Sequence, residues 1–510
     1  MTTQQQIQQI QNDLYQILTS SAHSDHKQKR NHITLWAQGL LPYPKISTNA
    51  QELLKEKIIC DLFEGNAPLT PRYILPDYQL FLSQGSEYLN ITPPTNLYEA
   101  INALLIIYQY VPSVTGYPVY LGNIDSLLEP FVNSVSREEA TNLLKLYLTN
   151  VDRTLSNAFV HLNIGPQKTV VGEIILKLEK ELKNSVPNLS LKIDSSTERA
   201  FILSAIDTAL ATAKPYFVNN SILESELSSN YGVASCYNTL KIAGGSHTLV
   251  RVNLKKVAEK QKKYDKFDDF EKYLQEVLNA QVEIINARAR FLVEEIKFFE
   301  HSFLARENLI KLENFTSMAG IFGLYECIEI IDGSKLGSDE RAEVVAQKIM
   351  SIIKNTIKNV NGVYCQGYQN KIGLHAQSGI DSDIDTTPGV RIKIGENPTS
   401  LSKQLTIAGA LHQYFDTGVS DIVVFDQTSH SNHQGVLTII EGALRAGVKV
   451  LSINAVDSEL IRVSGYLIKR SDFKKYQQGI PLRDETVSLG ANSLQNQNIL
   501  NRKQFPLKDY

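Results

Sequence analysis

The sequence predicts a single α/β barrel with its helices outside, and three observations support this fold class. Helix-type and strand-type patterns alternate between residues 168 and 220, as in the βαβ units of parallel sheets. A second such unit follows, with an apolar strand at Asp421 to Asp426, a helix at Val436 to Ala446 and a further strand after Gly447. No Gly/Ser-rich linker or low-complexity tract divides the 510 residues. We therefore expect one domain over residues 1–510.

The N-terminal part, residues 1–110, is expected to form a mainly helical layer. Its first segment has apolar residues at the spacing of an amphipathic helix, namely Ile7, Ile10, Leu14, Ile17 and Leu18. A stretch rich in proline and aromatic residues follows, from Pro68 to Tyr78. We interpret it as a packing or surface loop, with the alternative that Arg72 holds an anionic group of a substrate.

The middle of the chain predicts further elements in order. Gly116 to Asp125 has the pattern of a strand, a turn and a helix start, and the pair Ser136 and Glu139 caps a helix that reaches Val151. Within residues 168–220 the order is helix, strand, helix and a short strand at Tyr216 to Val218. Lys255 to about Asn308 is charged and helical, and we interpret its charges as a solvated face.

Composition limits the classes of function. Apolar residues make up 43% and charged residues 21%, and the net charge of -3 gives no electrostatic case for nucleic acid. The N-terminus lacks the order of a signal peptide, and no apolar run is long enough to cross a bilayer, so we expect a cytoplasmic protein without membrane contact. Four cysteines, at positions 60, 236, 327 and 365, form no CxxC pair, which argues against a disulfide framework or a zinc or iron-sulfur knuckle.

Other motifs of catalysis or metal binding are incomplete. Asp381, Asp383 and Asp385 imitate the start of a calcium loop, but Thr386 and Ile392 stand where its glycine and its glutamate belong. His430 and His433 lack a third ligand, so we expect no metal site. No P-loop, dinucleotide fingerprint or nucleophile elbow occurs.

Gly465 lies in the string Arg-Val-Ser-Gly-Tyr, residues 462–466, within a strand-type pattern. The simplest interpretation is a glycine at a bulge or at a close backbone approach. A chemical interpretation also exists, because the alpha carbon of glycine can become a planar radical without strain from a side chain. The five residues are identical to the signature of the glycyl radical enzymes, and the C-terminal segment 455–475 resembles the glycine radical loop of that family.

Cys236 is the candidate partner of Gly465. It lies in the segment 226–250, where small residues precede it and Gly244 and Gly245 follow. Considered alone, it would be an inert buried cysteine, as most free cysteines are. Its surroundings resemble the cysteine loop of glycyl radical enzymes, and this resemblance implies that Cys236 forms a thiyl radical. Pyruvate formate-lyase has adjacent cysteines at this point, and the diol dehydratases have a glutamate where this chain has Asn238.

Two further segments agree with the resemblance. Gly122 and Asp125 match a Gly-x-x-Asp segment upstream of the active site, and residues 386–391, Thr-Thr-Pro-Gly-Val-Arg, are similar to a turn between the cysteine and the glycine. The whole chain resembles the short YjjI-type branch of the superfamily. Arg391, Asn238 and Arg72 are therefore candidates for substrate binding. His375 is either an acid or base or a residue that orients a loop, and Asp383 is a weaker candidate for the same role.

The resemblance implies an oxygen-sensitive enzyme, of lyase or transferase type, that acts on a small oxygenated metabolite. It also implies a ten-stranded α/β barrel made of two parallel half-barrels, with outer helices. The radical on Gly465 would be installed by a separate activase that uses S-adenosylmethionine, with no bound metal or organic cofactor in this chain; a homodimer is compatible with it. Two alternatives remain open: a reductase-like enzyme for nucleotides or nucleosides, and an inert protein that keeps the fold.

Overall fold

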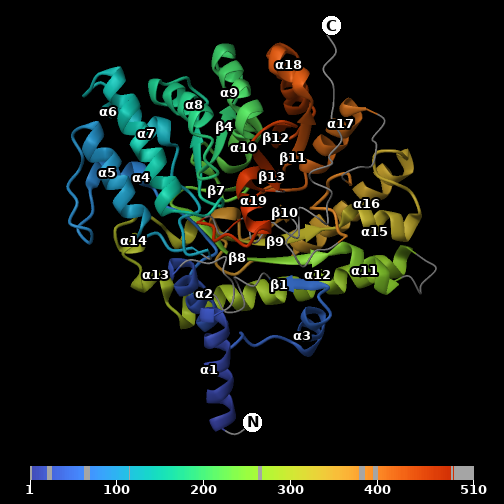
Figure 1. The fold of residues 1–510 in the computed structure, drawn as a ribbon. Helices are drawn as coiled ribbons and strands as arrows, with labels where there is room; N and C mark the ends of the chain where they lie inside the picture. Colours follow the sequence, from blue (N-terminus) through green and yellow to red (C-terminus); the bar gives the residue numbers. More distant parts are fainter. Residues whose placement is uncertain are drawn as a thin grey trace.

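The computed structural model describes residues 3–19, 26–61, 69–113, 115–261, 267–377, 385–393, 400–463, 465–483 and 486. These residues form an α/β structure whose strands make two five-stranded sheets and two separate hairpins. Figure 1 shows helices packed around the sheets, with strands β7 and β13 of the two hairpins near the middle of the molecule. The predicted α/β class is confirmed. The two five-stranded sheets are separate from each other in hydrogen bonding among the described residues, so closure into a ten-stranded barrel stays a prediction.

The first sheet contains β1 (Ile59–Asp61), β2 (Tyr73–Leu75), β8 (Gly244–Asn253), β9 (Phe315–Phe322) and β10 (Gly373–Ala376). Its strands β8, β9 and β10 are parallel to one another. Strands β1 and β2 both pair antiparallel with β8, at different positions along it. The N-terminal part therefore contributes two strands to this sheet in addition to its helices.

The second sheet has the order β11-β12-β5-β4-β3 and contains both βαβ units that the sequence predicts. Its strands are β3 (His161–Ile164), β4 (Asn188–Ile193), β5 (Tyr216–Asn219), β11 (Asp421–Phe425) and β12 (Val450–Ala455). Helices α8 (Val170–Leu182), α9 (Arg199–Thr212) and α18 (His433–Arg445) connect them. Strands β3, β4 and β5 are parallel to one another, as are β11 and β12, and the two groups pair antiparallel through β12 and β5, at Val450 and Val218.

The N-terminal helices are α1 (Thr3–Thr19), α2 (His26–Gln38), α3 (Thr48–Lys55), α4 (Tyr78–Gln84) and α5 (Leu97–Tyr108). The predicted opening helix forms, and Figure 1 shows it projecting from the body of the protein. Ile7 is 51% exposed and α1 has no buried residue. Among the described residues α1 contacts α2, and Leu14 and Ile17 of its apolar stripe are only partly buried.

The remaining helices surround the sheets. They are α6 (Ile124–Val132), α7 (Arg137–Thr154), α10 (Asn220–Leu227), α11 (Leu254–Gln261), α12 (Phe267–Arg290), α13 (Phe298–His301), α14 (Phe303–Arg306), α15 (Leu324–Asp332), α16 (Glu340–Asn359), α17 (Leu401–His412) and α19 (Arg470–Gln477). The apolar stripe predicted within residues 255–308 is buried along α12, where it packs against β8 and β9 in one core cluster. Within the described residues, no helix combines the length and the apolar character needed to cross a membrane.

The strand expected after Gly116 is not formed. Residues 117–123 form no described strand; they bond the second sheet through hydrogen bonds such as Leu121 N to His161 O at 2.8 Å and through an isolated bridge between Asn123 and Asn163. Pro118 has no N–H to donate to a ladder, and Gly122 has a φ of +102°, which turns the chain into α6. The segment is therefore an irregular edge of the second sheet.

Asp125, in the first turn of α6, ties this edge to β3. One carboxylate oxygen accepts a hydrogen bond from the N–H of Gly165 at 2.7 Å, and the other accepts one from Ser126 at 2.8 Å. Burial raises the pKa of Asp125 to about 6, and these hydrogen bonds offset only part of that effect.

The raised pKa of Asp125 predicts a pH dependence of stability. Between about pH 4 and pH 6 the folded state holds a proton that the unfolded state has lost, so the free energy of unfolding should fall as the pH rises, by up to about 3 kcal/mol. In Asp125→Asn this contribution is absent, and urea unfolding at several pH values should give a flatter profile than the wild-type protein. Parallel profiles would contradict the assignment.

Candidate functional site

The cysteine segment folds as a hairpin of β6 (Tyr231–Ala234) and β7 (Asn238–Lys241), with Cys236 in its turn. The side chain of Asn163, on β3, donates to Val233 O at 2.8 Å and accepts from Val233 N at 2.7 Å. Lys192, on β4, donates to Tyr231 O at 2.8 Å. Polar side chains of the second sheet thus hold the hairpin by its backbone.

The turn before Cys236 is fixed on both sides. Ser235 has a φ of +56°, which is uncommon for a residue with a side chain and is often found at functional sites. Its N–H donates to Val119 O at 2.8 Å, and its carbonyl accepts from His161 Nδ1 at 2.7 Å. Burial lowers the pKa of His161 to about 3, so this imidazole is neutral and its Nε2 accepts from the hydroxyl of Ser190 at 2.8 Å.

The thiol of Cys236 is buried and protonated near neutral pH. Burial raises its pKa, although backbone N–H groups, the positive charge of Arg72 and a hydrogen bond from Asn238 oppose this effect. Asn238 Nδ2 lies 3.4 Å from the Cys236 sulfur and 3.0 Å from Ala234 O. Its Oδ1 is buried and accepts no hydrogen bond from any residue that the structure describes. The Cys236 sulfur therefore keeps its hydrogen. Asn238, which orients this sulfur, also presents a buried hydrogen-bond acceptor, its Oδ1.

Gly465 lies in the turn of the second hairpin, between β13 (Leu460–Val463) and β14 (Tyr466–Lys469). The glycine is buried. Its carbonyl oxygen accepts hydrogen bonds from the hydroxyl of Tyr216 at 3.1 Å and from Asn188 Nδ2 at 3.4 Å. The residue is thus held against the starts of β5 and β4.

The two hairpins meet at Tyr216. Tyr216 belongs to the same apolar core cluster as Cys236, together with Val233 and Tyr237. Its ring is also nearly parallel to that of His161, at 6.0 Å between centroids, and His161 bonds the residue before Cys236. A single side chain therefore links the carbonyl of Gly465 to the cluster that contains the thiol.

Arg72 and His375 also lie near the cysteine turn. Arg72 is buried beside β2, with its guanidinium 5.1 Å from the ring centroid of Tyr73. Its charge partly opposes the rise that burial causes in the pKa of Cys236, and it adds to the lowering that burial causes in the pKa of His375. The stretch around Arg72 packs inside the protein and is not a surface loop.

The imidazole of His375 stacks on Tyr237 at 5.7 Å, and its Nδ1 donates to Thr417 O at 3.3 Å. Burial lowers the pKa of His375 to about 3. The ring is therefore neutral at neutral pH, and its buried Nε2, which has no hydrogen-bond partner among the described residues, is an acceptor. His375 Nε2 can therefore accept a hydrogen bond, and it carries no proton to donate as an acid.

Arg391 also faces the cysteine turn. Its guanidinium lies 5.7 Å from the ring centroid of Tyr237 and donates to Ser420 O at 2.8 Å and to Ser420 Oγ at 2.6 Å. The turn before it is attached to α15, where Glu326 accepts a hydrogen bond from Thr387 N at 3.0 Å. The structure thus brings Cys236, Asn238, His375 and both arginines together, whereas Asp383 lies outside the described residues.

The other cysteines lie elsewhere. Cys327 belongs to the core cluster of the first sheet, Cys60 is on β1 and Cys365 precedes a short 3-10 helix. None of them is in the cluster of Cys236. Among the described residues, no group of three or more His, Cys, Asp or Glu side chains is arranged to hold a metal ion.

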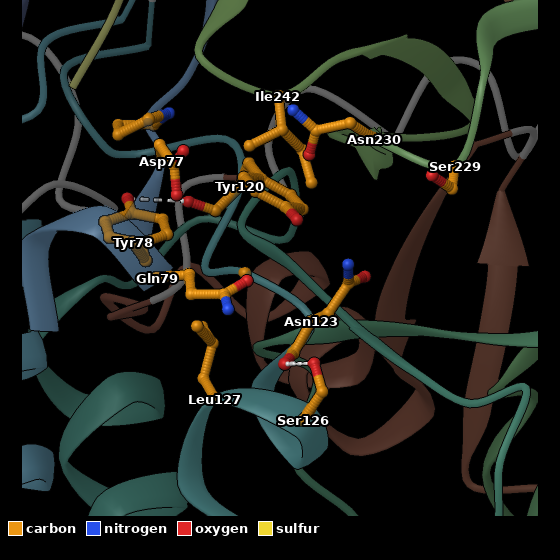
Figure 2. A pocket seen from close by; sticks show the side chains of 12 residues that line it. Asp77, Tyr78, Gln79, Tyr120, Asn123, Ser126, Leu127, Ser229, Asn230 and Ile242 are labelled. Carbon is orange, nitrogen blue, oxygen red and sulfur yellow. Dashed lines mark hydrogen bonds between the residues drawn. The ribbon is translucent and has the colours of Figure 1, made fainter. Parts of the chain in front are cut away.

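A cavity of about 360 Å³ lies at the base of the cysteine hairpin, next to Asn230 before β6 and Ile242 after β7. Figure 2 shows its polar side chains, with Asn123 and Ser126 at one end and Ser229 and Asn230 near the other. Its lining contains neither Cys236 nor Gly465, so it is separate from the proposed radical site.

Sequence reasoning did not single out Tyr216, His161 or Asn188. The signal is present in strands β3 and β4, which read His-Leu-Asn-Ile and Asn-Leu-Ser-Leu-Lys-Ile. Every residue in both strands is buried, although every second one is polar. Buried polar side chains need hydrogen-bond partners. Polar residues at every second position of a fully buried strand therefore indicate that one face of the sheet contacts the polar backbone of another segment.

Comparisons with known proteins identify a family that the chain matches over almost its whole length. A model of the family "Glycyl radical enzyme YjjI-like" matches residues 24–505. Protein YjjI of Escherichia coli (strain K12) is 38% identical over 502 residues, which cover 97% of this chain and 96% of that protein.

Two solved structures share the fold. Hydroxyproline dehydratase from Clostridioides difficile has a TM-score of 0.71 at 11% identity, covering 97% of this chain and 88% of that one. The anaerobic ribonucleotide reductase from Thermotoga maritima has a TM-score of 0.67 at 10% identity, covering 89% and 90%.

Proposed function

The chain belongs to the YjjI-like family of glycyl radical enzymes, and on this premise we propose that Gly465 stores a backbone radical that Cys236 passes to a substrate. The observation that carries this proposal is that one residue of β5 joins the two hairpins, because Tyr216 bonds Gly465 and packs in the cluster of Cys236. A radical relay needs the two groups on facing turns, shielded from water.

The proposed cycle balances hydrogen atoms. An activase removes one hydrogen atom from the alpha carbon of Gly465, and the glycyl radical then takes a hydrogen atom from the Cys236 thiol. The thiyl radical takes a hydrogen atom from a carbon of the substrate, and the product radical later takes it back. Gly465 finally returns its hydrogen to the sulfur, so the radical is stored again. The raised pKa of Cys236 supports this route, because a neutral thiol carries the hydrogen that a thiolate lacks.

We propose a small oxygenated metabolite as the substrate and a lyase or transferase reaction. Arg391 and Arg72 supply positive charge beside the cysteine turn, which suits an anionic group. Asn238 Oδ1 and His375 Nε2 are buried acceptors that a hydroxyl group can satisfy. One protein of this fold, hydroxyproline dehydratase, binds trans-4-hydroxy-L-proline as its substrate. Acyl transfer to a second thiol is disfavoured, because no other cysteine is in the cluster of Cys236.

Anaerobic activation tests the proposal. The full chain is incubated with a radical S-adenosylmethionine activase, S-adenosylmethionine and a reductant, and is then measured by electron paramagnetic resonance. A doublet is expected, because one alpha hydrogen remains on Gly465, and incorporation of [2-¹³C]glycine should broaden it. If the chain gives no doublet with an activase encoded in the same genome, it is an inert protein that keeps the fold.

A nucleotide reductase-like reaction is the alternative, since the fold is shared with an anaerobic ribonucleotide reductase. Saturable binding of ribonucleoside di- or triphosphates to the purified chain would favour it. A panel of small hydroxy acids and polyols, measured in the same way, should give binding if our proposal is right.

We predict that Asn238→Ala slows the exchange of hydrogen between the sulfur and Gly465. The variant loses the hydrogen bond that orients the thiol, and the loss of one such bond corresponds to about a tenfold effect. The measurement is the rate at which the doublet collapses to a singlet in deuterated buffer. Asn230→Ala, at the base of the same hairpin, is the control and should keep the wild-type rate.

A further inference from the structure

The carbonyl of Gly465 receives two hydrogen bonds from neighbouring strands. The hydroxyl of Tyr216 lies 3.1 Å from the carbonyl oxygen, and Asn188 Nδ2 lies 3.4 Å from it. Tyr216 is the first residue of β5, and Asn188 is the first residue of β4. A radical on the glycine alpha carbon shares its unpaired electron with this carbonyl. The two donors therefore contact the group that stabilises the radical.

Tyr216 is itself held in place from the glycine hairpin. The guanidinium of Arg462, on β13, lies 3.8 Å from the centroid of the Tyr216 ring. Arg462 is fully buried and donates to Ala213 O through Nε at 3.2 Å and Nη2 at 2.5 Å, and to Asn188 Oδ1 at 3.3 Å. Arg462 of the glycine hairpin thus packs on the Tyr216 ring, and the Tyr216 hydroxyl bonds Gly465 in the turn of the same hairpin.

The hydroxyl of Tyr216 is a donor at all moderate pH values. Burial raises its pKa, while the charge of Arg462 only partly opposes this effect. The carbonyl oxygen of Gly465 can only accept, so the direction of the hydrogen bond is fixed.

We propose that Tyr216 is the latch of the glycine hairpin, a positioning residue that keeps Gly465 beside the cysteine turn and must release its carbonyl before an activase reaches the alpha carbon. The inference rests on the proposed function of Gly465. It adds a point of control, because the latch sets how often the hairpin opens. It also adds an electronic effect, because hydrogen bonds to the carbonyl draw spin density toward oxygen.

The variant Tyr216→Phe tests the latch with little change in packing, since the ring remains for Arg462 and His161. The first measurement is amide hydrogen exchange of the peptide 455–475 in the unactivated full chain. Loss of one hydrogen bond should speed exchange about five- to tenfold in this peptide and not in the rest of the protein. The second measurement is the g-tensor of the radical after anaerobic activation, at high field, where Tyr216→Phe should shift the principal values.

Tyr231→Phe is the matched control. Tyr231 is a buried tyrosine of the same core cluster, but its hydroxyl bonds Asn220 Oδ1 at 2.7 Å and not the glycine hairpin. Its variant should keep wild-type exchange in 455–475 and the wild-type g-tensor. Unchanged exchange in Tyr216→Phe overturns the latch whether or not the wild-type protein forms a radical. A wild-type chain without any doublet overturns the proposed function instead, and the exchange result still decides the latch.

Discussion

Gly465→Ala should give a folded protein that shows no doublet after anaerobic activation, with the signal reduced to background. An alanine radical must swing its methyl group into the plane of the two neighbouring peptide groups. Gly465 is buried and its carbonyl is held by Tyr216 and Asn188 in the closed hairpin, so a methyl group on this carbon disfavours a planar radical there. The measurement is spin quantification by electron paramagnetic resonance beside wild-type protein treated with the same activase.

Gly442→Ala is the control for this experiment. Gly442 lies in α18, and a methyl group there would meet no atom within 4 Å. Alanine should slightly favour that helix and leave the doublet unchanged. If Gly465→Ala kept a doublet of wild-type intensity while folded, another residue would have to store the radical.

The sequence segments of both hairpins were predictable, because each contains a residue whose chemistry suits the proposed role. Glycine suits a stored radical, and a cysteine among small residues suits a tight turn. The sequence also predicted the βαβ units of the second sheet, since strand-type segments such as Asp421–Phe425, apolar from Ile422 onward, alternate with helical periodicity.

The contacts between the hairpins could not be predicted in the same way. Tyr216 and Asn188 start their strands and are separated in the sequence from Gly465 by about half of the chain's length. Neither belongs to a motif, and only the fold brings them to one carbonyl. The antiparallel pairing of β12 with β5 is a related case, because strand direction depends on the connections between elements and leaves no mark in the residues of either strand.

His375 illustrates a limit of reasoning from residue type. An unperturbed imidazole suits proton transfer near neutral pH. Burial against Tyr237 instead lowers the pKa of His375 to about 3, and burial is a property of the fold and not of the local sequence. Its proposed contribution is therefore that of a hydrogen-bond acceptor, and its role as a base stays a prediction.

Cys236→Ser should keep the glycyl radical and lose every step that passes through sulfur. The activase acts on Gly465 directly, so the doublet should form as in the wild-type protein. In deuterated buffer the wild-type thiol becomes S–D, and reversible transfer between sulfur and carbon carries deuterium to Gly465. The wild-type doublet should then collapse to a singlet, because deuterium couples weakly to the unpaired electron. A serine hydroxyl cannot mediate this exchange, since its O–H bond is much stronger than the alpha C–H bond of glycine, so the variant should keep its doublet.

This experiment needs no knowledge of the substrate. Cys60→Ser is its control, because Cys60 is on β1 and outside the cluster of Cys236, and its doublet should collapse at the wild-type rate. Catalytic turnover, once a substrate is found, should fall to background in Cys236→Ser alone. A doublet that still collapses in Cys236→Ser would mean that another group reaches the alpha carbon of Gly465. The hydrogen bonds that position the thiol, from Asn238 and the turn at Ser235, would then need a different explanation.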